Sequence, residues 1–97
     1  MEDSRIVRCA ILKILRKFHP QHRSEEFIQT MLVYQSLHLT VPELASEMGY
    51  LRDGGYVKTT HKKFKPTGDD WYEHIITKKG IDLLDGVCEE DSGVMVV

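Results

Sequence analysis

The stretch TVPELASEMGYLRDGGYVK, residues 40–58, changes from one kind of secondary structure to another within a few residues. Its first half has apolar residues at helical spacing. Thr40 can cap that helix, and Pro42 fits its first turn, where the backbone amides have no helical partner. The pair Gly54-Gly55 predicts a helix end with a left-handed cap, and Tyr56 begins a run typical of a β-strand. We therefore expect a helix that passes directly into a strand on the same core.

Two more helices are predicted before this stretch. Residues 4–18 form an amphipathic helix that Ser4 can cap, and Ser24 opens a second helix over residues 24–37. The short joint His38-Leu39 makes the second and third helices cross at an angle, as in a helix-turn-helix. Apolar residues at helical spacing are the expected core: Val7, Ala10, Ile11, Ile14, Leu15 and Phe18; Phe27, Ile28, Met31, Leu32 and Leu37; Val41, Leu44, Ala45, Met48 and Leu51.

A β-hairpin and a short helix are predicted after the third helix. Strands over residues 56–61 and 71–77 flank a turn-forming segment at 65–69. Trp71 and Tyr72 are adjacent in the second strand and point to opposite faces, so we expect at most one of them to be exposed. Thr77 can cap a last helix that ends at Gly86 and turns Ile81 and Leu84 inward.

Length and charge define one folded unit with an acidic end. The 97 residues suffice for a single core, and 41% hydrophobic with 29% charged residues is ordinary for a globular chain. The net charge is −2, but Asp85, Glu89, Glu90 and Asp91 lie in the last thirteen residues, which contain no Lys or Arg. We expect a mildly basic domain over residues 1–86 and a flexible acidic tail over residues 87–97.

The sequence contains no pattern typical of a signal peptide, a membrane span, a metal site or an enzyme active site. The first residues lack the pattern of a signal peptide and no apolar run could span a membrane, so we expect a cytoplasmic protein. Cys9 and Cys88 have no metal or disulfide spacing, and His19 and His22 lack carboxylate or thiolate companions. We expect no enzyme activity, metal or cofactor.

Two motifs resemble the winged helix-turn-helix superfamily. One is LTVPELASEMGYLRDGGYV, residues 39–57, which is similar to that superfamily's recognition helix and following strand. The other is ITKKGIDLLDG, residues 76–86, which is similar to the segment after the wing. The resemblance covers residues 4–86 and implies an α+β fold with a three-helix core, a two-stranded wing and a short C-terminal helix. Size and spacing are most similar to small phage and prophage proteins, and next to MarR-type and PadR-type regulators.

That resemblance implies a small protein that binds double-stranded DNA and regulates transcription. The third helix would enter the major groove and the wing would follow the backbone. On the helix, the outward residues would be Pro42, Glu43, Ser46, Glu47, Tyr50 and Arg52; on the wing, the cationic set would be Lys58, His61, Lys62, Lys63 and Lys65. Two glutamates facing phosphates weaken this interpretation, and the alternative is a winged-helix module that binds another protein without DNA.

The side of the first helix opposite its core face carries a second apolar row. Ile6, Cys9 and Leu12 recur three residues apart between basic residues, so an exposed stripe is expected there. A second copy of the chain could cover this stripe in a homodimer. The apolar end at residues 94–97 could cover it instead by folding back.

Overall fold

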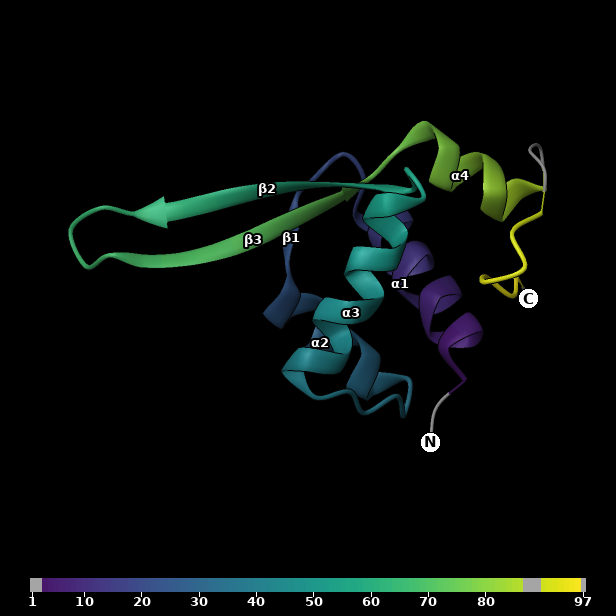
Figure 1. Ribbon diagram of the computed structural model, residues 1–97, viewed down its shortest axis with the longest axis horizontal. Helices are drawn as coiled ribbons and strands as arrows, with labels where there is room; N and C mark the ends of the chain where they lie inside the picture. Colours follow the sequence, from purple (N-terminus) through teal and green to yellow (C-terminus); the bar gives the residue numbers. More distant parts are fainter. Residues whose placement is uncertain (1–2, 87–89, 97) are drawn as a thin grey trace.

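The predicted passage from helix to strand is present in the computed structural model of the protein, which describes residues 3–86 and 90–96. The described residues form an α+β winged helix-turn-helix, in which helices α1 to α3 make the core and the β2–β3 hairpin makes the wing (Figure 1). A short strand, β1, completes an antiparallel sheet in the order β1-β3-β2. The elements are α1 (Ser4–Phe18), β1 (Arg23–Ser24), α2 (Glu25–Tyr34), α3 (Val41–Asp53), β2 (Val57–Phe64), β3 (Asp69–Ile76) and α4 (Lys78–Asp85).

Three of the four predicted helix caps are confirmed. Ser24, Thr40 and Thr77 each accept a backbone N–H in the first turn of α2, α3 and α4. The cap predicted for α1 is wrong by one residue, because the Asp3 carboxylate accepts the N–H of Arg5 at 2.9 Å and Ser4 is already helical. A carboxylate at this position is also favoured by the positive end of the helix dipole.

The glycine pair ends α3 as the sequence predicts, and only the second glycine is left-handed. Gly54 has φ −76° and Gly55 has φ +80°. The N–H of Tyr56 donates to Leu51 C=O at 2.9 Å, and the N–H of Gly55 donates to Arg52 C=O at 3.0 Å. These two bonds define a Schellman motif, which satisfies the last carbonyls of the helix while it reverses the chain into β2.

The joint between α2 and α3 is longer than predicted. Helix α2 ends at Tyr34 rather than at residue 37, and residues 35–40 connect it to α3. Ser36 takes a left-handed φ of 62°, and the N–H of Leu37 donates back to Leu32 C=O at 2.9 Å. A second Schellman motif therefore ends α2, at a serine that gives no sequence signal comparable to a glycine.

Helix α1 is the centre of the core. It contacts α2, α3, α4 and β3, so its predicted core face is buried and part of the opposite face is covered as well. Cys9 is 1% exposed and Leu12 is fully buried, whereas Ile6 is 40% exposed. The predicted exposed stripe of Ile6, Cys9 and Leu12 is therefore wrong, because two of its three members are buried within the chain; the homodimer through this stripe stays a prediction.

Two other burial predictions are corrected, both in α3. Val41 and Ala45 of α3 are exposed rather than buried, whereas Leu44 between them is buried, so the core face of α3 is narrower than predicted. In α4, Ile81 and Leu84 pack against the core as predicted, although they are only partly buried, and Leu83 is the most buried residue of the three. The remaining predicted core residues of the three main helices are buried or packed against the core.

The wing is longer than predicted. Its strands cover residues 57–64 and 69–76, rather than 56–61 and 71–77, and they project well past the helices (Figure 1). Trp71 and Tyr72 are 40% and 50% exposed, so the prediction that one of them packs on the core is wrong. They do point to opposite faces, but at that distance from the helices neither face has a core beneath it.

The end of the chain folds back onto the domain over residues 90–96. Val94 is 6% exposed, and the N–H of Met95 donates to Arg5 C=O at 3.1 Å. The prediction of a flexible tail is therefore wrong for these residues, and the alternative in which the apolar end folds back is confirmed for residues 94–96. Residues 87–89 and 97, and with them Cys88, lie outside the described residues.

Candidate nucleic-acid interface

The outward face of α3 differs from the predicted set in two residues. Pro42, Glu43, Ser46 and Arg52 are exposed, as expected of a face that could meet a partner. Glu47 is 7% exposed and Tyr50 is half-buried, so these two side chains are not available for contact with DNA. The side chains that replace them on the exposed surface are those of Val41 and Ala45.

Glu47 is turned inward because an arginine of α1 meets it. The guanidinium of Arg8 donates to Glu47 Oε1 from both Nε, at 3.3 Å, and Nη2, at 3.2 Å. The same guanidinium lies over the ring of Tyr50, 3.7 Å from its centroid, and donates from Nη1 to Gly93 C=O at 3.0 Å. Arg8 therefore joins α1, α3 and the folded-back end, a connection with no local signal in the sequence.

Glu43, the second glutamate predicted to face DNA, is part of the N-terminal cap of α3. Its Oε1 accepts the N–H of Thr40 at 2.9 Å, and Thr40 Oγ1 accepts the N–H of Glu43 at 3.3 Å. The backbone hydrogen bond from Thr40 lowers the pKa of the Glu43 carboxyl. This capping box keeps the one exposed glutamate of α3 at the first turn, where it compensates the helix dipole.

Asp91 fixes the folded-back end against α3 and the start of β2. Its two carboxylate oxygens accept the hydroxyls of Tyr50, at 2.8 Å, and Tyr56, at 2.6 Å. The Tyr56 hydrogen bond is the main cause of a lowered Asp91 pKa, and the bond to Asp91 in turn raises the pKa of Tyr50. Gly93 packs so closely here that a Cβ would lie 1.9 Å from the Tyr50 hydroxyl.

The predicted wing cations are all exposed, but they lie on different faces. Strand alternation and the register place Lys58 and Lys62 on one face of the hairpin and His61 and Lys63 on the other, while Lys65 lies in the turn. His61 Nε2 lies 3.1 Å from Asp70 Oδ2. None of the four lysines makes an ion pair with any residue that the structure describes.

A buried histidine ties the base of the wing to α2. His74 of β3 is 1% exposed; its Nδ1 lies 2.9 Å from Thr59 Oγ1, and its Nε2 lies 3.1 Å from Glu25 Oε1. Burial lowers the pKa of His74, and the Glu25 carboxylate opposes this only in part. Strand β1 also pairs with β3 here, with Arg23 opposite His74. The base of the wing is therefore held on both sides, and the direction in which the wing leaves the core is fixed.

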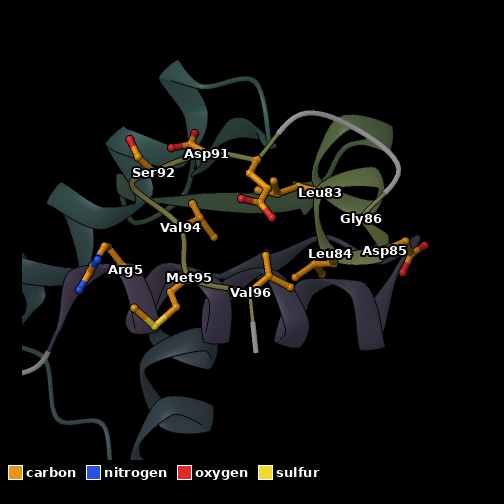
Figure 2. Close-up of a pocket in the computed structure, with 11 residues that line it drawn as sticks. Arg5, Leu83, Leu84, Asp85, Gly86, Asp91, Ser92, Val94, Met95 and Val96 are labelled. Atoms are coloured by element: carbon orange, nitrogen blue, oxygen red, sulfur yellow. The ribbon is translucent and has the colours of Figure 1, made fainter.

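A pocket lies between α4, the start of α1 and residues 90–96, and Figure 2 shows its lining. Leu83, Val94 and Val96 give it apolar walls, while Arg5 and Asp85 contribute charged groups. Among residues 3–86 and 90–96, no three His, Cys, Asp or Glu side chains are grouped so that they could hold a metal ion. In the same ranges, no helix has the length and apolar character needed to cross a membrane.

The fold has a counterpart among solved structures. It is similar to the crystal structure described as that of the "putative transcriptional regulator TA0346" from Thermoplasma acidophilum, with a TM-score of 0.69 and 20% sequence identity. The match covers 82% of this chain and 72% of the other. No family model matches the sequence, and no curated protein matches it. The likeness thus defines the class of fold, a winged helix, and at this identity it extends to the fold alone.

Proposed function

We propose that this protein is a DNA-binding transcriptional regulator that places α3 in the major groove and the wing along the phosphate backbone. One observation carries the proposal: α3 presents a face from which Glu47 is withdrawn, and the strand that follows it carries lysines with no acidic partner in the described structure. Surfaces of this kind attract a polyanion, because each lysine that meets a phosphate releases a counterion.

The exposed residues of α3 suit a groove lined by base edges. Ser46 and Arg52 can donate hydrogen bonds to bases or phosphates, and the methyl groups of Val41 and Ala45 can contact the methyl group of thymine. Arg52 is 55% exposed, and its nearest acid is the neighbouring Asp53 at 3.8 Å. Glu43 at the start of the helix can accept from the amino group of cytosine.

Two likenesses support the same proposal. The solved structure with this fold is described as a transcriptional regulator, and the size of the chain and the spacing of its two motifs resemble phage-type, MarR-type and PadR-type regulators. The more specific proposal is that the protein is a transcriptional regulator of the phage type.

Salt-dependent binding to duplex DNA tests the proposal. A labelled mixed-sequence duplex is titrated with the natural chain, with a Lys62→Ala/Lys63→Ala variant and with a Lys13→Ala/Lys17→Ala variant of equal charge altered on α1. The wing variant should bind more weakly, and its dependence on salt should be shallower by about one unit for each phosphate that the wing no longer neutralises. The α1 variant should bind as the natural chain does. No binding at low salt, or equal weakening in both variants, contradicts the proposal.

A protein-binding module is the second candidate, and a different surface favours it. Val33, Tyr34 and Val41, at the end of α2 and the start of α3, are 46%, 80% and 64% exposed. Exposed apolar side chains are a feature of many protein contact surfaces. If duplex binding fails while Tyr34→Ser abolishes retention of a partner from the host, this candidate replaces the first.

A further inference from the structure

One face of the wing carries two large aromatic side chains that are exposed to solvent. Phe64 is 51% exposed and Trp71 is 40% exposed. In the strand register Lys62 lies opposite Trp71 and Phe64 lies opposite Asp69, so the two aromatic residues are diagonal neighbours on one face of the hairpin. This face, with Phe64 and Trp71 as its centre, is called the aromatic face below.

Cations lie on the same face as the aromatic rings. Strand alternation puts Lys58 and Lys62 there, and the Nζ groups of both are outside any ion pair among residues 3–86 and 90–96. The two acids of this face are engaged within the chain: Glu73 accepts from Trp71 Nε1 at 2.8 Å, and Asp69 accepts from the Thr67 hydroxyl at 2.8 Å. The bond to Glu73 holds the indole by its edge, and the Trp71 side chain remains exposed to solvent.

Interleaved aromatic rings and unpaired lysines suit one kind of partner. Base faces stack on aromatic rings, and lysines beside the rings meet the phosphates between successive bases. An intact duplex hides its base faces in the stack, so only unpaired or unstacked nucleotides offer them. A protein partner would cover the rings equally well, but it would need its own acids for Lys58 and Lys62.

We propose that the aromatic face stacks on unpaired bases, and that the preferred partner of this protein is a duplex interrupted by a short single-stranded or unstacked stretch. The proposal rests on the proposed function for its duplex part, in which α3 occupies the major groove. The wing then contacts DNA beside the α3 site, since Phe64 is the last residue of β2 and Trp71 is the third residue of β3. Both therefore lie toward the outer end of a hairpin that projects past the helices (Figure 1).

The only tryptophan of the chain, Trp71, reports directly on this contact. Three unlabelled DNAs are added to the natural chain: a mixed-sequence duplex, the same duplex with a gap of a few nucleotides in one strand, and oligo-dT. The gapped duplex should bind about tenfold more tightly than the intact duplex and should quench Trp71 fluorescence. With affinities measured by isothermal titration calorimetry, which does not need the indole, Phe64→Leu and Trp71→Leu should remove the preference for the gap and leave affinity for the intact duplex unchanged.

Tyr72→Leu is the matched control, because Tyr72 is 50% exposed and lies on the opposite face of the same hairpin. This variant should keep the preference for the gap. Equal affinity for intact and gapped duplex with unquenched Trp71 overturns the inference and leaves the proposed function intact, whereas no binding to any of the DNAs overturns both. Loss of self-association in Trp71→Leu, measured by sedimentation without DNA, also overturns it and assigns the aromatic face to a second copy.

Discussion

Two charged regions of this protein differ in whether their charges are paired. Where α1, α3 and the folded-back end meet, Arg8, Glu47 and Asp91 form an inner charged cluster in which each group has a partner within hydrogen-bond distance. On the wing, the four lysines have no acidic partner in the described residues, and they are exposed. The difference separates charges that hold the fold together from charges that remain available to a ligand.

Burial gives the two regions different energetics. The side chains of Arg8 and Glu47 are 18% and 10% exposed, so water cannot readily replace one partner when the other is removed. Removing an exposed lysine costs little, because water already solvates it. Stability should therefore respond to the inner charged cluster, and DNA binding should respond to the wing.

The largest effect is expected for Arg8→Met, which keeps much of the side-chain volume and removes the charge. Glu47 would be left almost buried without its cation, and Tyr50 would lose the guanidinium over its ring, so we expect a loss of about 3 kcal/mol in the free energy of unfolding. Urea denaturation measures it. Arg5→Met is the control, since Arg5 lies on the same helix with its side chain 51% exposed. Equal destabilisation of the two variants would show that Arg8 adds nothing beyond a surface charge.

A smaller effect, about 1–2 kcal/mol at neutral pH, is expected for Asp91→Asn, because two tyrosine hydroxyls would lose an ionised acceptor. The Asp91 pKa is lowered from 3.8 by folding, so its contribution is present above pH 3.8 and is lost as the pH falls through the lower folded value. Denaturation at pH 6 and in steps below pH 4 should show this acid loss of stability in the natural chain and a reduced loss in Asp91→Asn. The neighbouring Glu90→Gln should behave as the natural chain, and an acid loss of equal size in all three would contradict the assignment.

The smallest effect on stability is expected for the wing. Lys62→Ala/Lys63→Ala should leave the thermal midpoint unchanged while it weakens DNA binding, whereas Arg8→Met acts chiefly on stability. Differential scanning calorimetry of the variant used in the DNA titration checks this. A lowered midpoint would mean that these lysines stabilise the hairpin itself. It would contradict the assignment of stability to the inner charged cluster and of DNA binding to the wing.

Much of the fold follows from local patterns that a reader of the sequence can find. Gly55 adopts the left-handed conformation expected of the glycine pair, and Thr40 and Thr77 cap the helices that follow them. Gly80 in the ITKKG motif has a packing reason as well, since a Cβ there would lie 2.6 Å from Tyr56 C=O. Each of these features depends on a few neighbouring residues, which is why the sequence predicts it.

The candidate site could be predicted only in part. The wing lysines and the exposed positions Pro42, Ser46 and Arg52 follow from helical and strand periodicity. The inward turn of Glu47 could not be predicted, because Arg8 lies 39 residues away in the sequence. Periodicity also placed Trp71 and Tyr72 correctly on opposite faces, yet it gives no information on how far the core reaches along the hairpin.

By itself the sequence determined the existence of the helices, three of their four N-terminal caps, the turn at Gly54-Gly55 and the hairpin after it, because backbone conformation responds to residues a few positions away. The tertiary structure alone decided which charges are paired, which aromatic rings stay in water and where residues 90–96 lie. Those properties depend on which segments meet after the chain has folded, and solvation and pairing are set by such meetings rather than by neighbours in the sequence.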